Sequence, residues 1–156
     1  MLAFKPASTD VHGAATGAWS NAYVGLPWRE RGLTRDGIAC WGLARLIYAE
    51  MLGIPVPDYC AEVASIQERA EVAAVFARST AVGPWVAVAE AQPFDIAVFR
   101  RAGIAAHVGI VVMEGRMLHI TAGRESAIVD FTTGCWSPRF SGFYRHRATM
   151  EATHVG

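Results

Sequence analysis

Short segments bounded by turn residues dominate the chain after Gly83-Pro84, and they constrain its fold more than any other feature. Five of these segments are apolar and β-branched and a sixth is aromatic and basic, a pattern that predicts strands. Glu114-Gly115, between the third and fourth segments, predicts a tight hairpin turn. The predicted strands are 85–88, 95–99, 106–113, 117–120, 126–129 and 142–147.

An amphipathic helix is predicted ahead of the strands, starting near Cys40. Apolar residues recur after it at positions 43, 46, 47 and 51, which is helical spacing. Asp36-Gly37 favours a turn just before the helix, and Gly53 favours its end. Cys40 is therefore expected in the first helical turn, where unpaired N–H groups and the helix dipole favour a thiolate.

Helical segments followed by a meander of strands predict an α+β fold in a single domain spanning residues 1–156. The helix at Cys40 should pack on an antiparallel sheet of about five or six strands. Other expected parts of the chain are an arm at 1–16, a short helix at 17–23, a loop at 28–37, one or two helices at 61–79, and an arm at 148–156.

Composition excludes several classes of protein. Of the 156 residues, 53% are apolar and 18% charged, so the chain can bury a core rather than stay disordered. Fourteen basic and fourteen acidic residues are scattered, whereas a nucleic-acid partner would require a clustered basic face. Apolar runs fall short of the roughly eighteen residues of a membrane span. Because Met1–Pro6 lacks the features of a secretory signal, we expect synthesis in the cytoplasm.

The three cysteines, Cys40, Cys60 and Cys135, are odd in number and show no CxxC spacing. This pattern disfavours a disulfide scaffold and a cysteine-rich zinc site. Cys60 and Cys135 are expected to be structural, whereas the helix start makes Cys40 the candidate nucleophile. A small buried packing role is the alternative for Cys40.

A thiol nucleophile needs a nearby base, and that base is usually held by a third polar group. Of the five histidines, His12 and His154 fall in the expected arms, and His146 lies near the end of the last strand. His107 and His119 remain as candidates, twelve residues apart in strand-like segments. A hydrogen-bonded structural role is the alternative for each.

Whether the two histidines meet depends on the register of the hairpin. A turn at Glu114-Gly115 should pair residues whose numbers sum to about 229–230, placing His107 opposite roughly residue 122 and His119 opposite roughly residue 110. Side chains alternate along a strand, so the residues alone leave open whether both histidines share a face. A metal site formed with Cys40 is a further alternative, but a closed structural site would want a fourth ligand.

These residues resemble the motifs of the NlpC/P60 family, papain-like cysteine peptidases that cut peptide bonds in bacterial cell-wall stems. The Asp-Cys-Ser-Gly-Leu motif of the family stands here as Ala39-Cys40-Trp41-Gly42-Leu43. Its Pro-Gly-Asp-Leu strand, its His-Val-Gly-Ile motif and its distal histidine stand as Pro93-Phe94-Asp95-Ile96, His107-Val108-Gly109-Ile110 and His119. Tyr23-Val24-Gly25-Leu26-Pro27-Trp28 resembles the Gly-x-Pro-Tyr element of the family.

The resemblance implies a papain-like fold and a role for each matched residue. Cys40 would attack the scissile carbonyl, His107 would act as general base and then acid, and His119 would hold the imidazole ring. The Cys40 backbone N–H would help to bind the oxyanion. No metal or organic cofactor is implied. Substrate contacts are expected from Tyr23, Trp28 and Trp41, with plain packing as the alternative for the two tryptophans.

Two departures from the family pattern concern the substrate. Ala39 replaces an aspartate that would cap the helix, a contribution of roughly 1 kcal/mol, and Trp41 replaces a serine. In the family, both polar residues help to hold the free amino end of the stem peptide. That contact is lost or replaced here, so the departures bear on the substrate rather than on the chemistry.

The expected function is therefore cleavage of an amide bond in peptidoglycan stem peptides. Cys-Trp-Gly-Leu at 40–43 and the segment 142–146 resemble the phage-tail branch of the family. Delivery by a phage tail, a prophage or a tail-like particle would bring a chain without an export signal to the cell wall. Two alternatives stay open: a structural tail-tip component without useful turnover, and an amide hydrolase or acyltransferase acting on another substrate.

Overall fold

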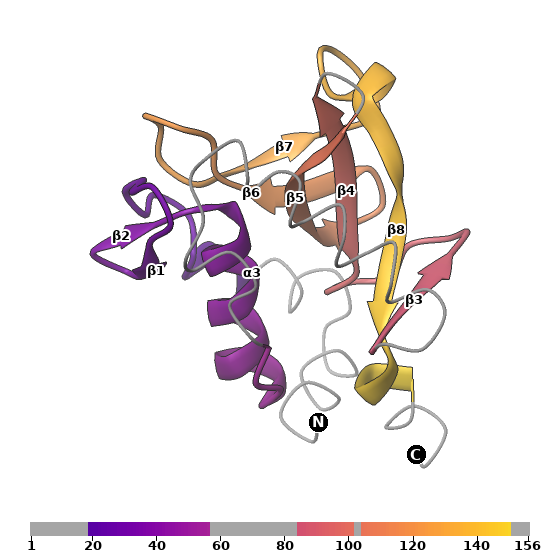
Figure 1. Ribbon diagram of the computed structural model, residues 1–156, viewed down its shortest axis with the longest axis horizontal. Helices are drawn as coiled ribbons and strands as arrows, with labels where there is room; N and C mark the ends of the chain where they lie inside the picture. The colour runs from indigo at the N-terminus through magenta and orange to yellow at the C-terminus, as the bar shows by residue number, and fades with distance from the viewer. Residues whose placement is uncertain (1–18, 57–83, 102–103, 151–156) are drawn as a thin grey trace.

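The computed structural model describes residues 19–56, 84–101 and 104–150. It shows an α+β fold in which a helical segment lies against a six-stranded antiparallel sheet, beside a two-stranded sheet (Figure 1). The order of the six strands is β3-β8-β4-β5-β6-β7. In chain order the elements are β1 (Leu33–Thr34), β2 (Gly37–Ile38), α3 (Cys40–Ile47), the π-helix η1 (Tyr48–Leu52), β3 (Trp85–Val88), β4 (Ile96–Arg101), β5 (Ile104–Met113), β6 (Arg116–His119), β7 (Ala127–Asp130), the 3-10 helix η2 (Ser137–Arg139) and β8 (Phe140–His146).

These elements confirm the predicted fold class and all six predicted strands, whose limits lie within two residues of those expected. The helices expected over 61–79 and the arm over 1–16 lie outside the described residues. Within the expected helix at 17–23, the described part contains one helical turn at 19–21. Residues 147–150, mostly in the expected C-terminal arm, also form a helical turn.

The helix α3 begins at Cys40, as its apolar spacing predicted. Ala39 is extended (φ −110°, ψ 176°), and its carbonyl accepts the Leu43 N–H at 2.8 Å, which starts the helical ladder. One side of the helix is buried, including Leu43 and Ile47. The last turn widens into η1 and ends at Gly53, whose φ of +67° suits glycine because it has no Cβ. The expected end at Gly53 is confirmed.

The segment expected to be a loop at 28–37 contains a small hairpin instead, so that prediction was wrong in part. Leu33 pairs with Ile38 and Thr34 with Gly37 around the turn at residues 35–36. The hairpin forms because Ile38 is fully buried under α3 and anchors the second strand in the core. The glycines of this segment predicted its turns, but they did not predict the burial of Ile38.

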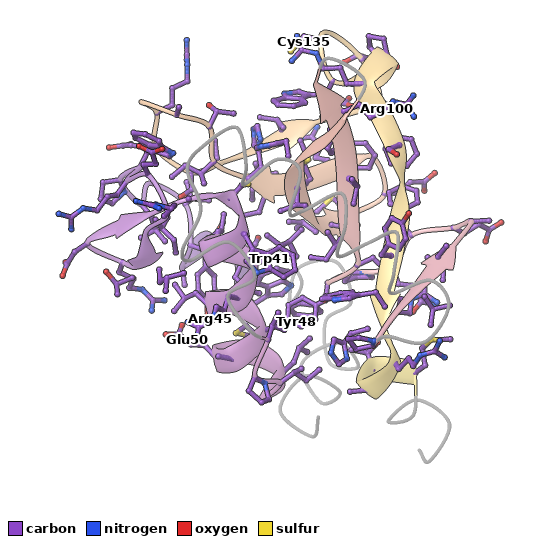
Figure 2. All side chains as sticks on the ribbon, viewed as in Figure 1. Trp41, Arg45, Tyr48, Glu50, Arg100 and Cys135 are labelled. Carbon is purple, nitrogen blue, oxygen red and sulfur yellow. The ribbon has the colours of Figure 1, made fainter. Side chains whose placement is uncertain are left out.

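The six-stranded sheet has two apolar faces. Side chains of β4 and β5 pack with α3 to form the main core, and Figure 2 shows Trp41 and Tyr48 in the layer between helix and sheet. The strand residues in this core are Ile96, Val98, Val108, Ile110 and Val112. Ala97 and Phe99 on β4 and Val111 on β5 face the other way, into a second cluster with many aromatic rings. That second cluster includes Ala97, Phe99, Val111, Met117, Phe131, Trp136, Phe140 and Phe143.

An ion pair fixes the start of β4. Asp95 is buried, and its carboxylate accepts two hydrogen bonds from the Arg145 guanidinium on β8, at 2.9 and 2.8 Å. The same carboxylate accepts the Gln92 N–H at 2.8 Å, closing the turn before the strand. Asp95 therefore orients the start of β4.

Candidate active site

Cys40 stands at the N-terminus of α3. It is the first residue of α3 and is half-buried. Ala39 supplies no side-chain cap, and the first turn of the helix carries no acidic residue. The positive end of the helix dipole is therefore directed at the thiol without a competing carboxylate from this turn, which favours the thiolate.

His107 and His119 are brought together by the register of the β5–β6 hairpin. Met113 pairs with Arg116 around the predicted Glu114-Gly115 turn. One extra residue on β5 then shifts the register, so that Met117, the next residue on β6, pairs with Val111. Past this bulge, paired residue numbers sum to 228, for example 111 and 117, rather than to the expected 229–230. Because the sum is even, odd-numbered residues of both strands share one face.

The two histidines form a hydrogen bond on that shared face. His107 Nε2 lies 2.9 Å from His119 Nδ1, and the two rings are nearly perpendicular at 84°. His119 is only 6% exposed, and burial lowers its pKa from 6.5 to about 4. The His119 ring is therefore uncharged at neutral pH, and its Nδ1 can accept a hydrogen bond.

The tautomer of His107 depends on which of the two rings donates in this bond. If His119 Nδ1 accepts, His107 Nε2 must carry the donated proton, and the lone pair of His107 is left on Nδ1. A histidine in this state can accept a proton at Nδ1 while keeping its bond to His119. The strand that carries His107, β5, packs against α3, the helix that begins with Cys40 (Figure 1).

Comparison with known proteins identifies the family. The sequence matches the model of the NlpC/P60 family over residues 25–145, more than two thirds of the chain. The chain belongs to the NlpC/P60 family. Members of this family are cysteine peptidases or amidases, typically peptidoglycan hydrolases. The comparison with curated protein sequences gave no significant match.

Solved NlpC/P60 structures share the fold. The NlpC/p60 domain of the peptidoglycan hydrolase SagA is 21% identical (TM-score 0.56), covering 86% of this chain and 97% of that domain. An NlpC/P60 protein from Bacillus cereus is 21% identical (TM-score 0.62, 86% of this chain and 40% of that one). A Staphylococcus aureus protein described as similar to lipoprotein, NLP/P60 family, is 20% identical (TM-score 0.60, 88% and 42%). This chain therefore spans about two fifths of the latter two proteins.

Two glycines of the NlpC/P60 motifs are explained by close packing. A Cβ at Gly42 would lie 2.0 Å from the carbonyl oxygen of Gly32, the oxygen that accepts the Ala39 N–H at 3.0 Å. A Cβ at Gly109 would lie 2.2 Å from the Met117 sulfur. The first glycine lets the segment before β1 approach the start of α3, and the second lets β6 pack beside His107's strand.

Phe94 stands where the NlpC/P60 pattern has glycine, and its backbone shows why glycine suits the position. Its φ is +78°, a region that bulky side chains rarely adopt. The ring is buried and stacks on Trp19 with centroids 4.3 Å apart, and the Phe94 carbonyl accepts the Tyr48 hydroxyl. Burial of the aromatic ring offsets the backbone strain.

The three predicted substrate-binding residues fall in different environments. Tyr23 is buried, and its hydroxyl donates to Glu50 at 2.7 Å; burial, followed by Glu50, raises its pKa to about 12. Trp41 is buried with its ring edge-on to Trp85. Trp28 is 37% exposed and bridges to Ile38, two residues before Cys40. Of the three, Trp28 has the side chain most open to a ligand.

Trp136 lies in the loop after β7, beside the two histidines, and the sequence did not indicate it as a site residue. Its indole stacks on His107 at 4.7 Å and 21°, and contacts His119 edge to face at 5.1 Å. A lone tryptophan in a segment without periodicity gave no signal beyond its size. Its place beside the histidines follows from tertiary packing.

Of the other two cysteines, only Cys135 lies within the described residues, directly before Trp136. Cys135 is exposed at the end of the sheet away from Tyr48, as Figure 2 shows, and Cys60 lies outside the described residues. Within the described residues, no group of three or more His, Cys, Asp or Glu side chains is placed to hold a metal ion. No helix in the same part of the chain is long and apolar enough to cross a membrane.

Proposed function

We propose that the protein is a cysteine peptidase that cleaves an amide bond in bacterial peptidoglycan stem peptides. The observation that carries this proposal is the 2.9 Å hydrogen bond between His107 and His119. It lies on the sheet that packs against the helix beginning with Cys40. Membership of a family of typical peptidoglycan hydrolases supports the substrate class.

In the acylation step, His107 Nδ1 takes the proton of the Cys40 thiol, and the thiolate attacks the carbonyl carbon of the scissile amide. The oxyanion that forms accepts a hydrogen bond from the Cys40 backbone N–H at the positive end of the helix. The tetrahedral intermediate collapses when His107 gives its proton to the leaving nitrogen. The products are a free amine and a thioester on Cys40.

In the deacylation step, His107 takes a proton from water, which attacks the thioester carbonyl. The second tetrahedral intermediate releases the carboxylic acid, and the returned proton restores the Cys40 thiol. His119 stays neutral throughout because burial lowers its pKa to about 4. It therefore accepts the Nε2 proton of His107 in both steps and keeps the ring aligned.

The substrate would reach Cys40 beside Trp28. The ring is exposed, and the backbone of Trp28 forms a β-bridge with Ile38, in the segment that leads into the nucleophile helix. Aromatic surfaces favour contact with flat amide groups and apolar side chains. Ala39 offers no carboxylate at this point, so recognition here would depend on packing rather than on an ion pair.

Digestion of purified peptidoglycan tests the proposal. Wild type should release new stem-peptide fragments, detected by mass spectrometry, whereas Cys40→Ala should release none. His107→Ala should lower the rate by about 10²- to 10⁴-fold, the usual contribution of a general base. Cys135→Ser, which removes an exposed thiol that has no role in the proposed chemistry, is the matched control and should retain the wild-type rate.

Thiol labelling separates an active nucleophile from a structural protein with the same fold. Cys40 should react with iodoacetamide near neutral pH much faster than Cys60 and Cys135. Equal, slow labelling of all three cysteines would contradict the peptidase and favour a structural tail-tip component. Rapid labelling of Cys40 without stem-peptide fragments would favour an amide hydrolase or acyltransferase with another substrate.

We also propose that a phage tail, a prophage product or a tail-like particle carries the protein to the cell wall. This proposal is supported by the sequence Cys-Trp-Gly-Leu at 40–43 and by the aromatic and basic last strand, both of which resemble the phage-tail branch of the family. Mass spectrometry of purified particles from the producing strain should then detect the protein. Its presence in the cell extract but not in the particles would refute this route.

A further inference from the structure

The segment between β7 and β8 is held at both ends and carries Trp136 between them. The Phe131 N–H donates to the Gly115 carbonyl at 3.1 Å, and the Thr132 N–H donates to Asp130 at 2.8 Å. At the other end, the Arg139 N–H donates to the Trp136 carbonyl at 3.0 Å. The first bond ties the start of the segment to the β5–β6 turn, and the last closes the turn that carries the indole.

Aromatic rings from three elements dock this loop on the sheet. Phe131 is buried and stacks on Phe140 of β8, with centroids 6.1 Å apart. Phe99 of β4 meets the rings of Phe131, Phe140 and Trp136 edge to face at 6.0, 5.8 and 5.3 Å. The loop is therefore part of the second core of the sheet rather than a loose connection.

Trp136 contacts both members of the histidine pair at once. Its ring is nearly parallel to His107, at 21°, and perpendicular to His119, at 89°. This combination fits the 84° between the two histidine rings. Rotation of the His107 ring away from His119 would break the stack with the indole and the hydrogen bond together.

The stack also acts on the charge of His107. During acylation His107 carries a proton and a positive charge, and the face of an indole attracts cations through its quadrupole. We propose that Trp136 is a positioning residue for the proposed reaction: its indole holds the His107 ring in the orientation bonded to His119 and favours the protonated form of that ring. This inference rests on the function proposed above.

The described charged and titratable groups around His107 come from three elements. His119 on β6 is its hydrogen-bond partner, and Cys40 begins the helix packed on β5. The guanidinium carbon (Cζ) of Arg139, in η2, lies 5.7 Å from the Trp136 ring centroid, so Arg139 is a second cation that interacts with this indole. The paired position on β4 is the uncharged Phe99. Replacing the indole of Trp136 by an apolar side chain leaves each of these charged and titratable groups in place.

NMR titration tests the proposal without relying on activity. In Cys40→Ala protein, which removes the coupled thiol, the His107 ring nitrogens are followed against pH. Replacing the indole by Trp136→Leu should lower the proton affinity of His107 by about three- to tenfold, the size expected for loss of a cation–π contact. Trp136→Phe should recover part of that loss because it restores an aromatic face.

Phe140→Leu is the matched control, because Phe140 belongs to the same cluster and its ring contacts are with Phe99, Phe131 and Phe143. It should loosen the loop to a similar extent while leaving the proton affinity of His107 unchanged. Equal shifts in Trp136→Leu and Phe140→Leu would show a merely structural role and overturn the proposal. So would an unchanged His107 titration in Trp136→Leu.

A second measurement links the titration to the thiol. In protein carrying Cys60→Ser and Cys135→Ser, the iodoacetamide rate of Cys40 is measured across pH. Trp136→Leu should move the acidic limb of this profile to higher pH and slow labelling at pH 6 by about three- to tenfold. A slow, ordinary Cys40 in wild type would refute the peptidase itself, whereas identical profiles in wild type and Trp136→Leu would refute only the role of the indole.

Discussion

Acidification should destabilise the protein through His119. This ring has a pKa of 6.5 in an unfolded chain and about 4 in the folded protein, because burial penalises its charged form. As the pH falls below 6.5, the unfolded state binds a proton that the native state does not bind, so native stability decreases. The difference of about 2.5 pH units (6.5 − 4), at about 1.4 kcal/mol each, gives a loss of about 3 kcal/mol between pH 7 and pH 4. Below pH 4 both states bind the proton, and the loss attributable to His119 levels off.

The assay is urea unfolding under reducing conditions, followed by circular dichroism at several pH values from 7 to 4. His119→Asn is the comparison, because it keeps a polar side chain but removes the titration. The variant should be less stable than wild type at pH 7, and the gap should narrow by about 3 kcal/mol at pH 4. Parallel stability curves for the two proteins would refute the claim that burial keeps His119 neutral.

Three further substitutions test the packing around the site. Gly42→Ala should lower the free energy of unfolding by about 2 kcal/mol or more, measured by urea denaturation, because its Cβ would overlap the Gly32 carbonyl oxygen; wild-type stability would contradict the close approach. Phe94→Gly should be about 1 kcal/mol more stable than Phe94→Ala in thermal unfolding, since only glycine relieves the φ of +78°; the reverse order would show that the backbone is not strained. Asp95→Asn should cost about 3 kcal/mol because it leaves the Arg145 charge without its partner, and adding Arg145→Met should recover part of that loss.

Much of the fold could be predicted because local patterns and tertiary structure agree. The β-branched segments at 85–88 and 106–113 form strands, and the apolar spacing after Cys40 forms a helix with one buried side. The hairpin β1–β2 was missed because two-residue strands carry no periodicity, and their stability comes from the burial of Ile38. Local sequence does not encode a contact made to a distant helix.

The candidate site was only partly visible in the sequence, for the same physical reason. His107 and His119 could be selected by spacing and motif, and the structure joins them by a hydrogen bond. Their shared face depends on one bulge residue, which no turn motif predicted. Trp136 contacts both rings from a loop that joins two later elements, so its role depends on how the aromatic cluster packs.

Because of the bulge in β5, the shared face of His107 and His119 depends more on the number of residues in this hairpin than on their identity. In an uninterrupted ladder running from the Met113–Arg116 pair, an odd-numbered residue would face an even-numbered one, and the two histidines would point to opposite sides of the sheet. Deleting one paired residue of this hairpin while the bulge stays would therefore separate the histidines, whereas deleting the bulge residue itself would leave a regular ladder and keep them on one face. Other insertions and deletions in the paired parts of the hairpin preserve the pair when they change the length by two residues.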